Sequence, residues 1–586
     1  MLKKKINIIN FSKNKTSNRI LSNEKVSLYI GPWCKNKINL ITENFDDTLD
    51  LYQSTNIKEY NQDIKLLKKN YLILLKLVSH ILNIAHNTKY KIRFWEILIG
   101  RWLNTWINSV YFRWDYTNKI IKKYRINNLF TYKREPEDFI PLDTGHAHLL
   151  HRGNNEWSEL TFEQILNYLQ KNLKKKLYIK KKIKNNYSIN ISYPKFTIFK
   201  NKSKLFLYKT EINFKTRLKI RMQYNLHSKT FYAEKKFTAN KKFNRKKLLN
   251  FLPKVNKKSF TSFLILNLIN NIPKIFLENF KDLESQYLKS KFPDKVKFII
   301  TSYGHYYDEL FKYYVSTQIN KKEDIKLCIL QHGYGNIYSN DDYFCSYHDY
   351  KISDMFLSWG KVKKKNKYIP FFYPRKNTYK IYKPKFLDIK KILFLTYSFS
   401  NNLISPPNGT LNGEIINKKN LLNLKFLLNH LKEGIKDKIF IKHLQITKYD
   451  NFRNYLTQNF NFIKFENNKK SFLQVEKNYN FFIHIFFGTP FFECLTLNRP
   501  CIIIYSKNTH YPLDKKFKLF ISKFKEANIL FEDIELAKNF INENYFCLDR
   551  WWYKKKLQTI RREFCKEYCL HVNKNSDIEI FKKIFK

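Results

Sequence analysis

The chain has 586 residues, with 109 Lys and Arg against 49 Asp and Glu, so its formal net charge is +60. A hydrophobic fraction of 43% and an aromatic fraction of 17% exclude a disordered tail or a low-complexity scaffold. The length predicts two or more domains, each large enough to bury a core. The eight cysteines are scattered and form no Cys-x-x-Cys pair. We therefore expect neither a disulfide scaffold nor a structural zinc module, and a reducing compartment fits best.

The excess of positive charge has three interpretations. Of the basic residues, 93 are Lys and 16 are Arg, and Asn, Ile, Phe and Tyr are also abundant. This pattern is typical of A/T-rich codon usage, which would leave the lysines on solvated faces. A nucleic-acid-binding surface would more often use Arg on a recognisable motif, and no zinc finger, RRM signature or KH loop is found in the sequence. The third interpretation is attraction to an anionic membrane surface or a polyanionic substrate.

The first residues do not predict a secretory signal, because the apolar run 6–11 is too short for one. The most apolar stretch, 71–85, contains Lys76 and His80 and is shorter than a membrane span. We therefore expect a cytoplasmic protein, either soluble or peripheral at the inner face of the cytoplasmic membrane.

The first 170 residues combine two predicted strands, 6–11 and 26–30, with long helices. Apolar residues at helical spacing predict helices around 64–82 and 95–110. The second helix repeats tryptophan along one face, at Trp95, Trp102 and Trp106. This stripe predicts a buried face, with a sugar-stacking platform as the alternative.

Residues 171–250 form a basic insertion, with 25 Lys and Arg and only two acidic residues, Glu211 and Glu234. Short alternating runs within it predict strands or irregular structure. We expect a solvated basic face or, as the functional alternative, a surface that docks on membrane phosphates or an anionic glycan.

From residue 260 onward, helices alternate with apolar strands. We expect helices over 263–280 and 309–316. The predicted strands are 296–302, 325–330 and 355–359, and then, after a Pro-punctuated linker over 370–384, 392–397, 439–441, 462–465, 481–485 and 501–505. Continuous apolar strands separated by helices predict parallel sheets covered on both faces. Two such series predict an α/β fold of two doubly wound, Rossmann-like domains that face a cleft, with ligands at the carboxyl ends of the strands.

This pattern places the domain boundaries. We expect an N-terminal domain over 1–170 and 251–375, interrupted by the basic insertion over 171–250. A C-terminal nucleotide-binding domain would span 385–545. A final helical segment over 546–586 would cross back to the N-terminal domain.

Glycine is rare, so its position after predicted strands is informative. Five glycines follow such strands: Gly304, Gly333, Gly335, Gly360 and Gly488. Glycine lets the backbone approach a ligand closely. We therefore expect these residues to mark the cleft.

The predicted strand 325–330 runs directly into Gln331, His332 and Gly333. A histidine at this point would face the cleft, where an imidazole with a near-neutral pKa suits general base catalysis. The alternative is a histidine held structurally in a turn.

A second candidate motif lies within 487–505. We predict Thr489 as the N-cap and Pro490 as the first residue of a helix. The free N–H groups of this helix would bind a phosphate, and Glu493, one turn later, would accept a hydrogen bond from a ribose hydroxyl. The alternative is an ordinary capped helix in a βαβ unit.

Other candidates carry weaker patterns. Lys442, at the end of strand 439–441, would neutralise the charge of a diphosphate. The alternative is an ordinary surface lysine. His146, His148 and His151 have one acidic neighbour, Asp143, and no thiolate, so we predict no metal site there. The absence of a Walker A motif and of Gly-x-Gly-x-x-Gly excludes the P-loop and dinucleotide interpretations.

The segment 487–505 is similar to the nucleotide-binding half of GT-B transferases of the CDP-glycerol glycerophosphotransferase and capsule Kdo-transferase types. In these a polar turn opens a helix, and an Asn-Arg-Pro-like turn, here with Arg499, leads into an apolar strand. The fuller resemblance is to a family of transferases found in O-antigen and surface-polysaccharide gene clusters. Its matching stretches follow one another along nearly the whole chain: 29–34, 83–86, 93–103, 112–114, 331–335, 352–360, 487–505 and 551–552. Residues 171–250 match poorly, and Thr489 stands where Ser or Asp is more usual.

The resemblance implies a GT-B-like glycosyltransferase that transfers a sugar from a nucleotide-activated donor to a growing surface glycan. His332 would be the catalytic base. The donor side would use Gln331, Gly333, Gly335, Lys442, Gly488, Thr489, Glu493 and Arg499. The acceptor side would use Arg93, Trp95 and Asp354.

We expect no metal, since no Asp-x-Asp of the GT-A type occurs, and no cofactor beyond the nucleotide-sugar as co-substrate. The partners would be that donor and a glycan or lipid-linked acceptor, with peripheral contact to an anionic membrane and no nucleic acid. Two alternatives stay open. One is a glycerophosphotransferase-type enzyme on the same fold, and the other is a basic nucleic-acid-binding protein driven by the charge of +60.

Overall fold

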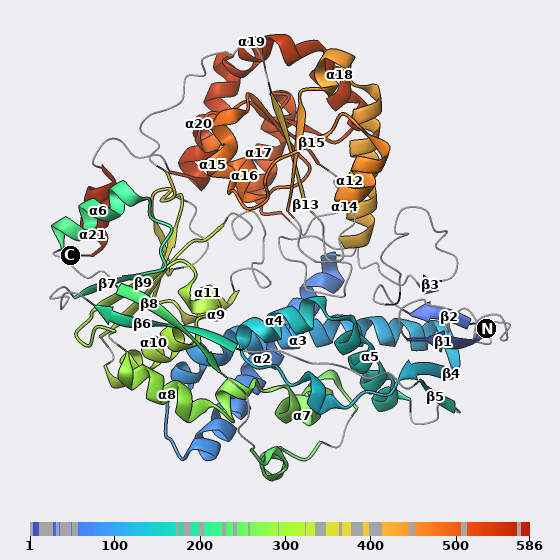
Figure 1. Ribbon diagram of the computed structural model, residues 1–586, viewed down its shortest axis with the longest axis vertical. Helices are drawn as coiled ribbons and strands as arrows, with labels where there is room; N and C mark the ends of the chain where they lie inside the picture. Colours follow the sequence, from blue (N-terminus) through green and yellow to red (C-terminus); the bar gives the residue numbers. More distant parts are fainter. Residues whose placement is uncertain are drawn as a thin grey trace. The chain divides into compact units, whose positions relative to one another are not determined.

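The computed structural model describes most of the chain (Figure 1). The described residues are 4–10, 27–30, 34, 48–49, 57–170, 175–179, 189–197, 204–224, 230–237, 243–255, 258–290, 292–322, 324–333, 347–361, 366–376, 391–397, 413–444, 452–505, 513–570 and 576–585. Among the described helices, none is both long and apolar enough to cross a bilayer. The chain divides into two units. Unit 1 comprises residues 1–209, 225–327 and 400–405, and unit 2 comprises residues 210–224, 328–399 and 406–586.

Unit 1 opens with a five-stranded sheet in the order β3-β2-β1-β4-β5. Every neighbouring pair in it is parallel. The strands are β1 (Lys4–Ile9), β2 (Ser27–Ile30), β3 (Thr48–Leu49), β4 (Tyr124–Tyr132) and β5 (Lys175–Ile179). This is the strand order of a Rossmann-like half, although the sequence pattern predicted only β1 and β2.

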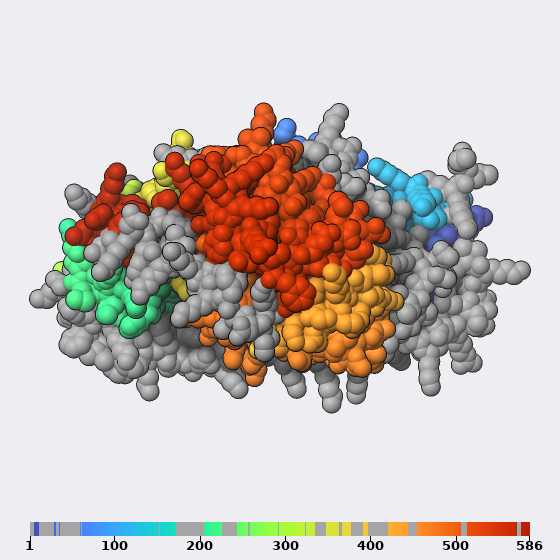
Figure 2. Space-filling model, turned by 90° about the horizontal axis from the view of Figure 1, so that it is seen from above, coloured from blue at the N-terminus to red at the C-terminus, as the bar shows by residue number. Residues whose placement is uncertain are grey.

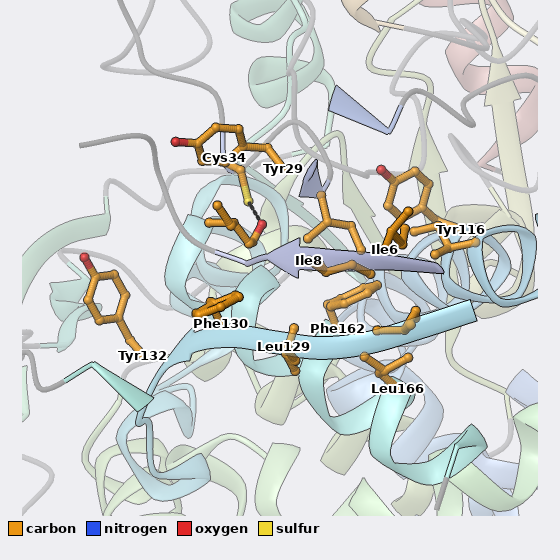
Figure 3. Close-up of a cluster of buried hydrophobic side chains, with 14 residues drawn as sticks. Ile6, Ile8, Tyr29, Cys34, Tyr116, Leu129, Phe130, Tyr132, Phe162 and Leu166 are labelled. Carbon is orange, nitrogen blue, oxygen red and sulfur yellow. Dashed lines mark hydrogen bonds between the residues drawn. The ribbon is translucent and has the colours of Figure 1, made fainter. Parts of the chain in front are cut away.

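Figure 3 shows the core of this sheet, where Ile6 and Ile8 of β1 face Leu129 and Phe130 of β4. Phe162 and Leu166, one helical turn apart, add a helix face to the same core. The thiol of Cys34, four positions after the end of β2, donates to the carbonyl of Ile9 at 3.4 Å, at the end of β1. The sheet is therefore built around β1 and β4, the two strands at which the chain order reverses.

The helices of unit 1 are mostly long and buried on one face. They are α2 (Ile57–His86), α3 (Ile92–Lys123), α4 (Thr144–Gly153), α5 (Asn155–Leu169), α7 (Phe260–Asn271), α8 (Phe280–Lys289), α9 (Gly304–Tyr307) and α10 (Glu309–Lys321). The predicted helix over 263–280 is wrong in its length, because the chain leaves α7 at Ile272-Pro273 and starts α8 at Phe280. Proline lacks the N–H that a continuing helix needs.

The tryptophan stripe of α3 is buried, as its helical spacing predicts. Trp95, Trp102 and Trp106 are all at most 1% exposed. The indole N–H of Trp95 donates to Asn83 Oδ1 at 3.0 Å, which locks α3 onto the end of α2. These rings serve the core of unit 1.

Unit 1 also contains two further pairs of strands and the beginning of β10. β7 (Leu205–Tyr208) pairs in parallel with β9 (Phe298–Thr301), and β6 (Ile189–Thr197) pairs antiparallel with β8 (Thr230–Phe237). β10 (Lys326–Leu330) begins in unit 1, where the amide of Lys326 donates to the carbonyl of Lys297 at 2.8 Å.

Unit 2 contains two further sets of parallel strands. The first runs β10, β11 (Met355–Ser358) and β12 (Tyr368–Pro370). The second is a six-stranded sheet in the order β15-β14-β13-β16-β17-β18. Its strands are β13 (Ile392–Tyr397), β14 (Ile439–Leu444), β15 (Lys464–Phe465), β16 (Phe481–His484), β17 (Cys501–Ile504) and β18 (Leu530–Phe531).

Five of the six strands of this sheet lie close to the ranges that the sequence predicts, and β18 was not predicted. All four residues of β16 and all four of β17 are buried, and only apolar runs tolerate this.

The helices of unit 2 are α6 (Phe214–Gln223), α11 (Tyr347–Ile352), α12 (Gly413–His430), α13 (Glu433–Lys436), α14 (Phe452–Asn459), α15 (Phe472–Val475), α16 (Thr489–Thr496), α17 (Lys515–Glu526), α18 (Ile534–Asn544), α19 (Leu548–Trp552), α20 (Lys555–Tyr568) and α21 (Ser576–Ile584). The predicted α/β class with parallel sheets is confirmed.

The chain after α20 returns to the strands β11 and β12. The amide of Leu570 donates to the carbonyl of Trp359 at 2.6 Å, and its carbonyl accepts from the amide of Tyr373 at 3.1 Å. Gly360, next to Trp359, lies against the backbone of α20. A Cβ atom at Gly360 would lie 2.1 Å from the carbonyl oxygen of Glu567. The sequence interpretation of Gly360 as a cleft residue is therefore replaced by close packing of two backbones.

We expect Gly360→Ala to destabilise unit 2 by about 3 kcal/mol, because a rigid backbone must move to admit the methyl group. Urea denaturation measures the loss. Gly434→Ala is the matched control, since a Cβ there meets nothing within 4 Å and alanine is the better helix former. Equal stability of the two variants would contradict the close approach of α20.

Candidate functional site

The end of β10 is fixed by the side chain of Gln331. Its amide oxygen accepts from the amide N–H of Trp359 at 2.8 Å, and its amide nitrogen donates to the carbonyl of Gly333 at 2.8 Å. Gln331 is buried. The sequence analysis expected it to bind the donor. In the structure both ends of its amide contact backbone groups, which shapes the turn that presents His332.

His332 projects from this turn and forms a pair with Glu211. Its Nδ1 lies 3.2 Å from Glu211 Oε1, and the imidazole is 43% exposed while the carboxylate is only 13% exposed. A carboxylate at Nδ1 fixes the ring and favours the tautomer with the proton on Nδ1, so Nε2 is the nitrogen that would take a proton. This is the arrangement that a general base requires.

Glu211 is held in place by the residues that follow it. Asn213, the N-cap of α6, donates to the carbonyl of Pro374 through its backbone N–H at 2.8 Å and through its side chain at 3.0 Å. One turn later, the hydroxyl of Thr216 donates to Asp577 Oδ2 of α21 at 2.6 Å. Figure 1 shows α6 and α21 side by side. Glu211 therefore has a rigid support on both the Pro374 and the α21 side.

A second carboxylate, Glu493 of α16, lies in the same region of unit 2. It is 1% exposed, and its Oε1 accepts from the hydroxyl of Tyr373 at 2.7 Å and from Arg375 Nη1 at 2.7 Å. Arg375 also approaches Glu211, with 3.6 Å between Nε and Oε1. Burial raises the pKa of Glu493, and the neighbouring guanidinium of Arg375 opposes this shift. Arg375 thus stands between the two carboxylates.

The start of α16 differs from the prediction by one residue. The N-cap is Gly488, with Thr489 as the first helical residue and Pro490 as the second. The amide of Gly488 donates to the carbonyl of Phe486, that of Phe491 donates to Gly488, and Pro490 has no N–H. This helix start therefore offers a ligand the amide and hydroxyl of Thr489 rather than a full turn of free N–H groups.

The two motifs that the sequence singled out lie together. A Cβ atom on Gly333 would be 3.4 Å from Thr489 Oγ1. The turn after β10 and the start of α16 are thus neighbours within unit 2. The candidate site consists of six residues that these elements bring together: Glu211, His332, Tyr373, Arg375, Thr489 and Glu493.

Two other residues expected on the donor side contact different partners. Lys442 donates to the backbone carbonyls of Asn467 at 3.0 Å and Lys470 at 2.6 Å, and burial lowers its pKa. Arg499 is buried and forms an ion pair with Glu476, which also pairs with Lys376 at 2.5 Å. Both cations are therefore already engaged within the protein.

The remaining predicted residues lie elsewhere. Trp95 is in the core of unit 1, and Arg93 is partly buried beside it in α3. Asp354 is partly buried between α11 and β11. Gly335 is outside the described residues, and Gly488 acts as the N-cap, where a Cβ would lie 2.0 Å from the ring of Phe486.

The histidines 146, 148 and 151 are partly or fully buried in α4. His146 Nδ1 accepts from the amide of Leu142 at 3.0 Å, and burial lowers its pKa to about 4. Within the described part of the chain, no group of three or more His, Cys, Asp or Glu residues is placed to hold a metal ion.

Sequence reasoning missed Glu211, Tyr373 and Arg375. Glu211 is one of only two acidic residues in 171–250, and its rarity there was the feature that could have drawn attention to it. Tyr373 and Arg375 lie in the stretch predicted as a linker, about 120 residues before Glu493. No local pattern indicates a contact over that separation.

Comparison with known proteins identifies the class as a transferase. The model of the LIC12162 family transferases matches residues 15–584, so the chain belongs to this family. The transferase family expected from the sequence is thereby confirmed. No curated protein matches the chain at a significant level.

Several solved structures resemble parts of the chain at low similarity. TarM has a TM-score of 0.31 and 10% identity, over 49% of this chain and 54% of its own. The pneumococcal O-GlcNAc transferase GtfA, solved with UDP and GlcNAc, has a TM-score of 0.30 and 12% identity, over 49% and 56%. The wall teichoic acid polymerase TagF, solved with CDPG, has a TM-score of 0.31 and 12% identity, over 52% and 84%. The chain spans about half the length of the first two, and we base the function on the family and on the site.

We expect Arg375→Gln to destabilise the protein by about 3 kcal/mol at pH 8, because it leaves a buried carboxylate without its cation. Burial already raises the pKa of Glu493 above that of the unfolded chain, and loss of Arg375 would raise it further. Stability from such a group is present at low pH and is lost as pH rises through the folded pKa. Urea denaturation should therefore show a smaller loss at pH 5 than at pH 8. The double variant Arg375→Gln/Glu493→Gln should lack this difference, and a loss independent of pH in the single variant would contradict the assignment.

Proposed function

We propose that the protein is a glycosyltransferase that moves a sugar from a nucleotide-activated donor to a hydroxyl group of a growing surface glycan. The observation that carries this proposal is the pair of His332 and Glu211 beside Arg375 and the start of α16. A base next to a cationic, phosphate-compatible surface is what such a transfer needs. Family membership supplies the transferase class.

In the proposed reaction, Nε2 of His332 takes the proton of the acceptor hydroxyl. The acceptor oxygen forms a bond to the anomeric carbon of the donor. The bond between that carbon and the phosphate oxygen breaks, and its electron pair leaves with the nucleotide. Glu211 stabilises the imidazolium that forms, since its carboxylate lies at Nδ1.

Arg375 and Thr489 would stabilise the negative charge on the departing phosphate. Arg375 is 24% exposed at its side chain and pairs with Glu493 through Nη1, and a planar guanidinium with five donors suits an anion such as a phosphate. Thr489 adds its amide and hydroxyl. Arg375 takes the place that the sequence analysis gave to Lys442 and Arg499.

No metal is required by this scheme, and the donor is the only co-substrate. The acceptor would be a glycan or a lipid-linked glycan, and the protein would work in the cytoplasm at the inner face of the membrane. The lysine clusters 174–176 and 180–182, expected to contact anionic lipid, lie outside the residues whose side chains are described. A glycerophosphotransferase reaction on the same site would differ in the mass of its product.

We expect His332→Ala to lower kcat by about 10²–10⁴-fold while donor affinity stays largely unchanged, since only the base is lost. Glu211→Gln should lower kcat less, by about 10–100-fold, because the amide can still contact the ring but cannot stabilise the imidazolium. Turnover of nucleotide-sugars with mass analysis of the product is the measurement. His430→Ala, on the exposed end of α12, serves as the control. Near-normal turnover of a folded His332→Ala variant would remove His332 from the mechanism.

We expect Thr489→Asp to leave the melting temperature unchanged, because a carboxylate is favourable in the first turn of a helix. It should weaken nucleotide affinity strongly by repelling the phosphates. Thermal stabilisation by nucleotides measures this, since a ligand at 100 times its Kd adds roughly 2.7 kcal/mol. Ser522→Asp, on the exposed face of α17, carries the same change of charge elsewhere. Unchanged affinity in Thr489→Asp would place the phosphates at another cation.

A further inference from the structure

Helix α6 exposes an apolar stripe on one side, made by Phe214, Leu218 and Met222. Phe214 and Met222 are each 68% exposed, and Leu218 is 45% exposed. Figure 2 shows the green atoms of this part of the chain at the surface. At about 100° per residue, these three positions cover an arc of roughly 80° on the helix. They therefore form one continuous stripe rather than scattered single residues.

The opposite face of α6 is the one that packs on the protein. Thr216 and Ile220 are buried, and Thr216 donates to Asp577 of α21. The ring of Tyr224, after the helix, packs on Phe581 of α21 with 5.6 Å between centroids. Among the described residues, α6 packs on unit 2 through the face opposite the stripe. An exposed apolar patch of this kind marks an interaction site.

Four cations flank the stripe, and α6 contains no acidic residue. By helical position, Lys215 and Lys219 lie on one side of it, and Arg217 and Arg221 lie on the other. Lys219 is 3.6 Å from Asp577, and Arg221 is exposed. On the exposed side of α6, an apolar stripe between two rows of cations allows apolar insertion together with attraction to anionic head groups.

We propose that α6 is a membrane-docking helix that seats on anionic phospholipid, with Phe214, Leu218 and Met222 inserted at the level of the acyl chains. A nucleic acid would contact only the cations and would leave the apolar stripe exposed to water. An anionic bilayer would contact both, the cations through its head groups and the stripe through its acyl chains. Since α6 is already folded and held by α21, docking does not have to supply the free energy of forming the helix.

This inference deepens the proposed function and rests on it in one respect, the delivery of a lipid-linked acceptor. Glu211, the partner of His332, lies two residues before the N-cap of α6. A helix seated on the bilayer therefore places the base close to the surface in which a lipid-linked glycan is anchored. The assignment identifies a docking element with described side chains, separate from the lysine clusters at 174–182.

The test is co-sedimentation with vesicles of mixed phosphatidylglycerol and phosphatidylcholine, without any donor or acceptor. The wild-type chain should bind these vesicles and not pure phosphatidylcholine. Replacing the stripe by Phe214→Ser/Leu218→Ser/Met222→Ser should weaken binding more than tenfold. Replacing two cations by Lys215→Gln/Arg221→Gln should weaken it about 25-fold, since each cation near an anionic bilayer contributes about fivefold.

Matched controls alter similar residues elsewhere in unit 2. Leu536→Ser removes a leucine that is 61% exposed on α18, and Lys554→Gln/Lys555→Gln removes two exposed cations before and within α20. Both should bind vesicles within about twofold of wild type. If the triple serine variant does not fold, the single variant Leu218→Glu carries the same test.

Two results would overturn the assignment. One is a wild-type chain that ignores anionic vesicles even at low salt. The other is binding that does not depend on the stripe, that is, a stripe variant that binds vesicles, or duplex DNA in preference to vesicles, as tightly as the wild type does. Vesicle binding that depends on the stripe, in a protein that turns over no nucleotide-sugar, would support α6 and contradict the transfer reaction. Turnover on a water-soluble acceptor without vesicle binding would do the reverse.

Discussion

Burial of the Glu493 carboxylate obliges the protein to bring a cation and a hydroxyl group to it. A buried charge without partners is strongly unfavourable, and here Arg375 and Tyr373 meet that demand from a segment about 120 residues away. Arg375 then reaches Glu211, and Glu211 holds His332. The orientation of an exposed imidazole thus depends on a carboxylate inside α16. A second buried carboxylate, Glu476, likewise binds Lys376, the residue after Arg375, together with Arg499. Two successive residues, 375 and 376, are therefore each held by a different buried acid.

Two arginines of different sequence context, Arg499 and Arg375, each pair with a buried glutamate. Arg499 looks like a ligand residue in sequence because it stands in a turn before a strand, yet its partner is Glu476. Arg375 looks like part of a linker, yet it stands between the two carboxylates of the candidate site. The sequence does not reveal which acid each arginine contacts, because that partner is a property of the folded chain.

Much of the fold could be predicted from sequence because doubly buried strands must be apolar along their whole length. β10, β16 and β17 are such strands, and each was predicted within two residues. β4 escaped prediction, because its sequence mixes Arg125 and two asparagines with apolar residues. β3 has two residues and β5 is rich in lysine, so neither gives a recognisable pattern.

The candidate site was predictable to the extent that strand ends and helix starts are visible in sequence. His332 and Thr489 lie at such points, and Gly333, the residue after His332, lies close to Thr489, since a Cβ on it would be 3.4 Å from Oγ1. Their supporting residues were not predictable. Glu211 belongs to a stretch whose composition resembles a solvated surface, and its contact with His332 crosses about 120 residues of chain. Only the tertiary fold brings these groups together.

The return of the chain after α20 also has a consequence for biosynthesis. Leu570 joins Trp359 to Tyr373, and Asp577 secures the helix that follows Glu211. These residues leave the ribosome more than 200 residues after His332, and domains generally begin to fold as their N-terminal parts emerge. A nascent chain that already contains both members of the His332–Glu211 pair therefore still lacks the supports that position them. The arrangement of the candidate site is therefore completed only after residue 577 has been translated, long after His332 itself.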